Sequence, residues 1–326
     1  MLEVCLNINV NRTVGSLYKC IAKNAIYYGN VDAFVSENIT MIGYSKIYNE
    51  QELWNTFDLV SESSSHNIVV ELYKKYGFED MMKLIEGDYS FLLLDYNLHG
   101  EESWLYVVRD PFGISPLYFY ANTSEYSFSF TPKENYHPFI AGHSHKFSHS
   151  HKVSSIWKPV DKPQSFYKSP FFSIYKEIDA EKNMNIQNQI DMSIKKRVDW
   201  IHYKYPEVGL DIGMVVPFNT NPIIGTPFLF LPIIPSEYPK EELDLPTTVA
   251  KYLTENMPTI KHVFIVESFT KDWMEKKYLD RCKQIPNIYL EVSMQKWTNV
   301  FLKYGIQLYM PFLDQVLIQN VKPEIL

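Results

Sequence analysis

The histidines of one short segment are the residues whose spacing most directly suggests chemistry: His143, His145, His149 and His151, in the pattern H-x-H-x3-H-x-H. Alternate residues of an extended strand lie on one face, so each pair could ligate Zn²⁺, Ni²⁺ or Cu²⁺. No Cys or carboxylate lies among them, and the neighbouring serines fit a solvated loop that protonates in part near pH 6. A metal site and a solvated loop are thus competing interpretations.

Cysteine thiolates are the second group of side chains that could do chemistry, as nucleophiles. The chain has three cysteines, Cys5, Cys20 and Cys282. They are too few and too scattered for a disulfide framework or a zinc ribbon. We therefore expect reduced, buried thiols.

Composition limits the class of protein. A chain of 326 residues and 38.3 kDa can form two domains, each with its own core. A net charge of -7 argues against a phosphate-binding surface, so we expect no nucleic-acid partner. No apolar run is long enough to span a membrane and the start lacks a signal-peptide pattern, so we expect a cytoplasmic protein without membrane contact. The many Tyr, Phe and Trp side chains fit a protein-contact surface or simply filled cores.

The residues from Glu71 to Tyr120 predict the elements that would position a site. An amphipathic helix should end at Gly77. The apolar run Tyr89 to Asp95 and the following Trp104 to Val108 predict an antiparallel hairpin. Arg109 to Gly113, with its Pro and Gly, predicts a turn before extended structure resumes at Leu117.

Patterns on either side complete the first half. Leu2 to Val10 and Ile39 to Tyr48 read as strands, Val14 to Tyr28 as a helix, and a further helix should start at Asn49. From Pro132 to Lys162 the chain reads as a loop.

The second half alternates helices and strands, which predicts an α/β layer. Its expected elements are helices at Asp179 to His202, Pro246 to Asn256 and Lys271 to Lys283, and strands at Ile212 to Val216, Pro227 to Ile234 and Val263 to Val266.

Three of these stretches resemble, in order, the class II glutamine amidotransferase domain of the asparagine synthetase family. The family carries a YEKYG-like helix end, a strand like GMFAFALYD and a turn and strand like RDRFGIKPLYY. Tyr304 to Asp314 resembles its HGLEVRVPFLD stretch, and Asp179 to His202 its first synthetase-domain helix.

The resemblance implies an α+β domain followed by an α/β domain. Residues 1–133 would form an αββα sandwich of the Ntn-hydrolase-like type, residues 134–178 a connection rich in His and Pro, and residues 179–326 a truncated α/β synthetase-like domain. Members of the family commonly dimerise.

The family's glutaminase chemistry requires an N-terminal cysteine, whose thiolate attacks glutamine while its α-amino group acts as base. Position 2 of this chain is Leu2, and Cys5 would be exposed only after removal of Met1 to Val4. Where the family has NGEIYN for its oxyanion hole, Tyr44, Ser45 and Lys46 replace Asn, Gly and Glu. Ser65 stands where the family's SDTE motif supplies an acidic residue for the substrate ammonium.

This chain also departs from the family in the residues of the ATP site. Its SGGLDSS loop follows a strand, and the aligned stretch here is Pro217, Phe218, Asn219, Thr220, Asn221 and Pro222. Proline lacks the N–H donor, and Phe fills the space that a phosphate would need. Gln307 and Tyr309 replace a Glu and an Arg of the family near the C-terminus.

These replacements together predict an asparagine-synthetase-like pseudoenzyme that serves as a structural or partner-binding subunit. We expect no cofactor, no small-molecule substrate, and a protein partner or self-association. One alternative is an asparagine synthetase, dependent on glutamine or ammonia, or a related amidotransferase using Cys5 after N-terminal processing. ATP and Mg²⁺ are expected as cofactors only under this enzyme alternative. The second alternative is metal binding through His143 to His151.

Overall fold

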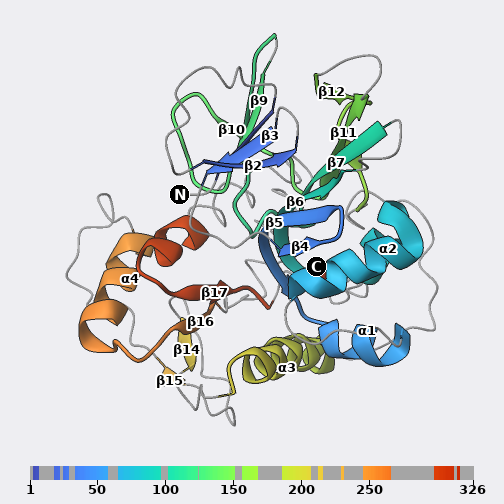
Figure 1. Cartoon of the computed structure of the whole chain (residues 1–326). Coiled ribbons are helices and arrows are strands. Elements are labelled where there is room, and N and C mark those ends of the chain that lie inside the picture. Colours follow the sequence, from blue (N-terminus) through green and yellow to red (C-terminus); the bar gives the residue numbers. More distant parts are fainter. Residues whose placement is uncertain are drawn as a thin grey trace, which may run out of the picture. The chain divides into compact units, whose positions relative to one another are not determined.

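The structure is a computed structural model (Figure 1). It describes residues 3–6, 18–22, 25–28, 34–57, 65–96, 102–123, 125–150, 156–167, 186–206, 212–215, 229–230, 245–265, 297–311 and 314–315. The chain divides into two compact units, Met1–Lys168 and Ser169–Leu326. We describe each unit by itself.

Two antiparallel sheets form the framework of the first unit. The six-stranded sheet has the order β10 (His137–Pro138), β8 (Tyr118–Ala121), β9 (Tyr126–Ser129), β1 (Glu3–Leu6), β3 (Ala25–Tyr28), β2 (Tyr18–Ala22). The seven-stranded sheet has the order β12 (Lys158–Pro159), β11 (His143–Ser150), β7 (Glu102–Arg109), β6 (Gly87–Asp95), β5 (Ile39–Ile47), β4 (Phe34–Ser36), and β13 (Gln164–Ser165) also pairs with β11. The predicted strands around β5, β6 and β7 and their antiparallel hairpin are confirmed.

Strict alternation along β5, β6 and β7 divides the apolar side chains between two cores. One core includes Leu92 and Leu105 of the seven-stranded sheet together with Phe128 of the six-stranded sheet. The other includes Phe91 and Tyr106 together with residues of α1 (Glu50–Phe57) and α2 (Ser65–Leu84). The described residues thus form a helix layer, a sheet and a second sheet, which are three layers of the expected αββα sandwich.

Gly77 interrupts α2, as the sequence predicted. Its φ of 75° and ψ of 178° are not helical, so the chain kinks there before a last helical stretch to Leu84. This backbone conformation is essentially restricted to glycine.

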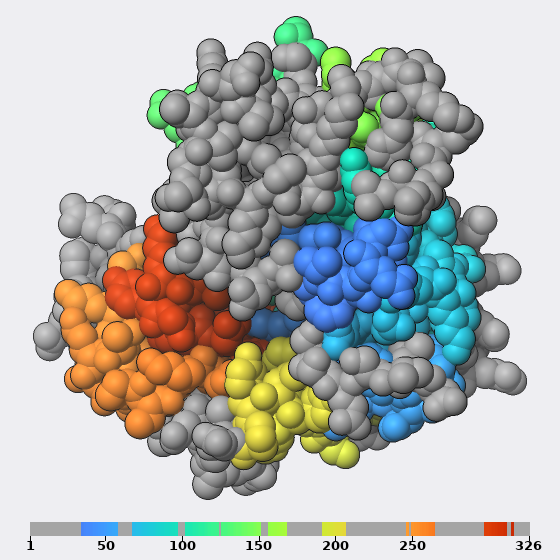
Figure 2. All heavy atoms as spheres, viewed as in Figure 1, coloured from blue at the N-terminus to red at the C-terminus, as the bar shows by residue number. Residues whose placement is uncertain are grey.

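At the far end of the seven-stranded sheet, β4 is the last strand in the order. Its Val35 is 62% exposed. Figure 2 shows the segment that begins with β4 at the surface of the molecule, drawn in blue.

The helix predicted over Val14 to Tyr28 is wrong, because the structure has strands β2 and β3 there. The two strands pair antiparallel, and β3 also pairs with β1. Their sequences, YKCIA and AIYY, include aromatic and β-branched residues that favour strands. Pairing with β1 outweighs the helical spacing of Leu17, Ile21 and Ala25.

The loop expected from Pro132 to Lys162 is also wrong. Strand β11 pairs with β7 from Ser144 to Ser150, inside the seven-stranded sheet. The Ser/His composition concealed a two-residue alternation, which buries Phe147 and His149 and leaves the residues between them less buried. The first compact unit therefore extends to Lys168, beyond residue 133.

The second unit contains a parallel sheet, as expected of an α/β layer. Its order is β15 (Leu229–Phe230), β14 (Ile212–Val215), β16 (His262–Ile265), β17 (Gln307–Tyr309). The predicted helices at α3 (Ile186–Lys204) and α4 (Leu245–Asn256) are confirmed. The expected helix Lys271 to Lys283 lies outside the described residues.

No helix in the described part of the chain combines the length and the apolar character that crossing a membrane requires.

Candidate functional site

Tyr44, Ser45 and Lys46, which the sequence analysis aligned with the oxyanion hole of the resembled family, lie near the end of β5. Tyr44 packs against the core between the two sheets, and its ring meets Phe130 edge-on at 5.6 Å. Burial raises the pKa of Tyr44 above its usual value, so the phenol stays neutral. By strand alternation Lys46 shares this face and Ser45 lies on the helix side. Tyr44 is the residue that the sequence analysis placed where the resembled family has the Asn of its oxyanion hole.

Cys5 lies inside β1, which is paired on both sides. Glu3 and Val4 precede it in the strand and pair with β9 and β3 as fully as Cys5 does. Val4 is opposite Phe128, a residue of the core between the sheets, whereas Cys5 is opposite Ser127. Cys5 is therefore an internal residue of β1, paired with Ile26 of β3 and with Ser127 of β9.

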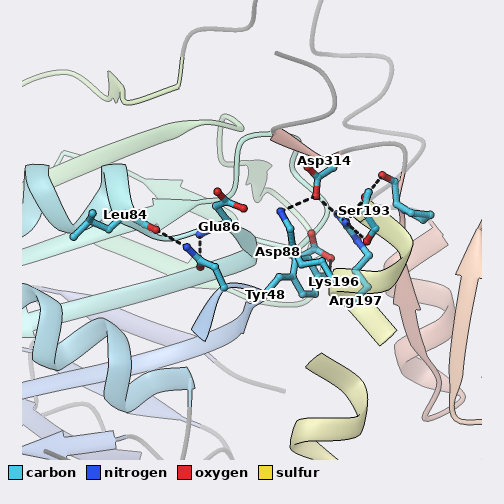
Figure 3. A network of polar contacts seen from close by, with 10 residues as sticks. Tyr48, Leu84, Glu86, Asp88, Ser193, Lys196, Arg197 and Asp314 are labelled. Carbon is cyan, nitrogen blue, oxygen red and sulfur yellow. Dashed lines mark hydrogen bonds and ion pairs between the residues drawn. The ribbon is translucent and has the colours of Figure 1, made fainter. Parts of the chain in front are cut away.

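Ile47, Tyr48 and Asn49, which the family-like motif also contains, stabilise the turn that follows β5, and Figure 3 labels Tyr48 together with Leu84 and Glu86 of the neighbouring segment. Ile47 is fully buried. The Asn49 amide donates to the Leu84 carbonyl oxygen at 2.8 Å, and its Oδ1 accepts from the Glu86 N–H at 3.0 Å. These contacts join the end of β5 to the end of α2, which is a structural role.

Asp88 is a polar residue of this region that the sequence analysis missed. It is 2% exposed and accepts a hydrogen bond from the Tyr48 hydroxyl through Oδ2 (Figure 3). Lys46 lies directly opposite it in the β5–β6 ladder. In the strand that resembles the family's GMFAFALYD, Asp88 takes the place of an apolar residue. This interruption of an apolar run could have identified Asp88 from the sequence.

Arg109 fixes the turn after β7 from within the protein. Its guanidinium is fully buried and donates to the carbonyl oxygens of Ser115 at 2.9 Å, Phe139 at 2.6 Å and Gly113 at 2.7 Å. Since these bonds engage all three guanidinium nitrogens with backbone, Arg109 organises the fold.

Asp110 holds the same turn through its carboxylate. Oδ1 accepts from the N–H groups of Phe112 and Ile114, each at 3.0 Å, and Oδ2 accepts from Ser115 N–H at 2.8 Å. Complete burial and then the nearby charge of Asp88 raise the pKa of Asp110 to about 7, although Arg109 and the turn N–H groups lower it. The predicted turn is confirmed, and its central residue is a carboxyl that titrates near neutrality.

Two hydroxyls on the helix side of the sheet have no hydrogen-bond partner: those of Ser45 and Tyr89. The two residues are directly opposed in the ladder. Burial, and next the charges of Asp110 and Asp88, raise the pKa of Tyr89 well above its usual value. A phenol held in its neutral form is a poor nucleophile.

The described histidines of the cluster are engaged with the protein. His143 Nδ1 lies 2.7 Å from the Ala141 carbonyl oxygen, and His145 Nε2 lies 2.8 Å from that of Asp161. His149 is fully buried, with its ring centroid 5.2 Å from Trp157. Burial lowers the pKa of His145. Among residues that the structure describes, no group of three or more metal-binding side chains occurs. His151 lies outside them.

The other residues singled out in the sequence lie partly outside the described part of the chain. Ser65 begins α2, and its side chain is not among those described. The stretch from Pro217 to Pro222 follows β14 and lies outside the described residues. Tyr309, where the family has Arg, is fully buried, and its hydroxyl lies 2.9 Å from His262 Nδ1.

Within the second unit, a buried ion pair joins α3 to the segment after β17 (Figure 3). Arg197 donates to Asp314 Oδ2 at 2.9 Å and to Ser193 Oγ at 2.6 Å, and Ser193 Oγ donates to the Pro311 carbonyl oxygen at 2.6 Å. Lys196 Nζ lies 3.4 Å from the same Asp314 oxygen. In the sequence, Arg197 is a charged residue at the helical spacing of Ile190, Ile194 and Ile201, and this position could have indicated a buried ion pair.

A comparison with protein families matches the part of the chain that contains β4 to β9. Residues 31–134 match the glutamine amidotransferase domain family. A protein of Methanocaldococcus jannaschii, named provisionally as a glutamine-hydrolysing asparagine synthetase, is 30% identical over 93 residues, which are 28% of this chain and 17% of that protein. The matched region therefore spans about a sixth of the curated relative's length.

Solved structures add only weak likenesses. Glutamine phosphoribosylpyrophosphate amidotransferase from B. subtilis, complexed with ADP and GMP, is 14% identical with a TM-score of 0.32, over 88% of this chain and 67% of that one. A glutamine aminotransferase class-II domain protein from Silicibacter pomeroyi is 10% identical with a TM-score of 0.28, over 49% and 90%. TM-scores this low support no argument. The sequence matches therefore show that residues 31–134 are similar to a glutamine amidotransferase domain and that part of the chain is distantly similar to an asparagine synthetase.

Proposed function

We propose that this protein is a catalytically inactive relative of glutamine-dependent asparagine synthetases that acts as a structural or partner-binding subunit. One observation carries the proposal: Tyr44 packs on Phe130 in the core between the sheets, at the position that would provide an oxyanion donor. The family-like residues that remain, such as Arg109 and Asn49, make bonds to the backbone.

The position of Cys5 supports the same proposal. Glutaminase chemistry needs a thiolate beside a free α-amino group and preorganised donors for the oxyanion. Removing Met1 to Val4 would take away Glu3 and Val4, which pair with two neighbouring strands. Both residues would have to leave the sheet before Cys5 could become the first residue of the chain.

A subunit of this kind would act through its surface. We propose a protein partner or a second copy of the chain, with no cofactor and no small-molecule substrate. Light scattering coupled to size exclusion tests self-association directly, and a monomer at all concentrations would restrict the proposal to a different partner.

The decisive experiment measures ammonia release from glutamine by the purified protein, with its intact mass recorded on the same sample. We expect release no faster than with Cys5→Ala, and a mass that retains the residues before Cys5. The enzyme alternative would be established by two results together: glutamine turnover that Cys5→Ala abolishes, and an intact mass that lacks Met1 to Val4. Calorimetry with ATP and Mg²⁺ tests the synthetase part, and we expect no heat of binding.

A further inference from the structure

Three aromatic rings of the second unit form a row that leads from the surface to the interior. Tyr205 follows α3 and is 40% exposed, Trp200 of α3 is 6% exposed, and Tyr309 at the end of β17 is fully buried. The ring centroids of Tyr205 and Trp200 are 6.3 Å apart, and those of Trp200 and Tyr309 are 6.4 Å apart. Phenol and indole rings lose a single electron more easily than aliphatic or amide groups, and an electron passes readily between rings this close.

A base lies beside the buried end of this row. The Tyr309 hydroxyl is 2.9 Å from Nδ1 of His262, which is 3% exposed and begins β16. When His262 carries its proton on Nε2, the lone pair of Nδ1 accepts the phenol O–H. Phe264 lies directly opposite Tyr309 in the ladder, and the two rings stack at 5.2 Å. The phenol ring is therefore packed in place beside its proton acceptor.

The proton acceptor matters because an oxidised phenol is a strong acid. When a tyrosine loses one electron its hydroxyl proton leaves, and a base in hydrogen-bond contact can take that proton in the same step. Tyr73 donates to the carboxylate of Asp95, which is a much weaker base than an imidazole. The Tyr89 hydroxyl has no partner at all. Tyr309 is therefore better placed than Tyr73 or Tyr89 to be oxidised.

We propose that Tyr309 and His262 form a one-electron oxidation site, which Trp200 and Tyr205 connect to the surface. The oxidant is a small-molecule radical that accepts one electron at the exposed ring of Tyr205. One electron passes from Tyr309 through Trp200 and Tyr205 to this oxidant, which is thereby reduced. The hydroxyl proton of Tyr309 passes to His262 Nδ1, which leaves a neutral phenoxyl radical beside an imidazolium. A one-electron reductant reverses both transfers.

The site makes use of a position at which this chain departs from the resembled family. The family has Arg where Tyr309 stands, so the replacement supplies the oxidisable ring. The proposed reaction needs neither glutamine nor ATP. It is therefore independent of the proposed loss of the two substrate sites, and each proposal can fail without the other.

Electron paramagnetic resonance of the full chain, after flash oxidation with a photo-oxidised ruthenium polypyridyl complex, tests the proposal. We expect a phenoxyl signal that outlasts those of exposed tyrosines, because burial shields Tyr309 from other radicals. Tyr309→Phe should abolish this long-lived signal, since the ring remains and only the hydroxyl is lost. Tyr73→Phe is the matched control, because it removes another hydrogen-bonded phenol, and it should leave the signal unchanged.

Two further variants test the base and the route, after circular dichroism has shown that each is folded. His262→Gln retains hydrogen-bonding groups but cannot take up the proton, so the long-lived signal should be lost although Tyr309 is present. Trp200→Phe should slow the appearance of the signal, because Phe is not oxidised under these conditions. A long-lived signal that persists in Tyr309→Phe or in His262→Gln would overturn the proposal. An unchanged rate of appearance in Trp200→Phe would overturn the route through that residue.

Discussion

Lys46 lies directly opposite Asp88 across the ladder between β5 and β6. Both residues depart from the family-like pattern, one in the oxyanion-hole stretch and one in the apolar strand. Opposite charges at directly opposed positions stabilise a sheet. The two departures from the family-like pattern are thus compatible with each other as an opposed pair of unlike charges.

Lys46→Glu is expected to destabilise the first unit by about 0.5–1 kcal/mol, because it places like charges opposite each other. The free energy of urea unfolding measures the change. Lys46→Gln, which removes the charge without reversing it, should have a smaller effect. Equal effects of the two variants would show that Asp88 does not sense the charge at position 46.

Tyr44→Ala should cost about 2 kcal/mol of unfolding free energy, since a partly buried ring that packs on Phe130 is lost. Tyr44→Phe preserves the ring and is the control, with a change well below 1 kcal/mol. If Tyr44→Ala were neutral, the core around Phe130 would not depend on this residue, and a ligand could occupy its place.

Arg109→Lys should destabilise the protein by about 3 kcal/mol or more, because an ammonium cannot replace three directed guanidinium bonds and leaves buried carbonyl groups unpaired. Thermal and urea unfolding both report the loss. Lys83→Ala, which breaks an exposed pair with Asp80 on α2, should cause no measurable change.

Gly77→Ala should lower stability by about 1–3 kcal/mol. A Cβ at this position would meet no atom within 4 Å, so the cost is conformational. Gly77→Asn should be about as destabilising, because its ψ of 178° lies outside the left-handed helical region that Asn tolerates. A nearly neutral Asn variant would mean that the kink relaxes.

The sequence predicted the strands that bury apolar side chains in long runs. Continuous or alternating apolar patterns identified β5, β6 and β7, and turn residues identified Arg109 to Gly113. Strand β11 was missed because only Phe147 among His143 to Ser150 is apolar, although the alternation was present. Its pairing with β7, distant in the chain, determines its conformation.

The polar part of the site was harder to predict. Asp110 read as a turn residue, and the sequence could not show that the turn after β7 is buried against β6, where the Asp110 N–H bonds the Tyr89 carbonyl oxygen. Cys5 was read as the only candidate nucleophile, and the sequence could not show that it pairs with strands β3 and β9. Both facts depend on contacts between segments far apart in the chain.

The order of strands in the two sheets has a consequence for synthesis on the ribosome. The six-stranded sheet takes β1 to β3 from the start of the first unit and β8 to β10 from its later part, while β4 to β7 between them belong to the other sheet. Strand β1 lacks one of its two neighbours until β9 has been translated. Such long-range pairing makes folding slow, and the nascent segment must stay unaggregated until then. We therefore expect the first unit to become protease-resistant in a single late step during translation.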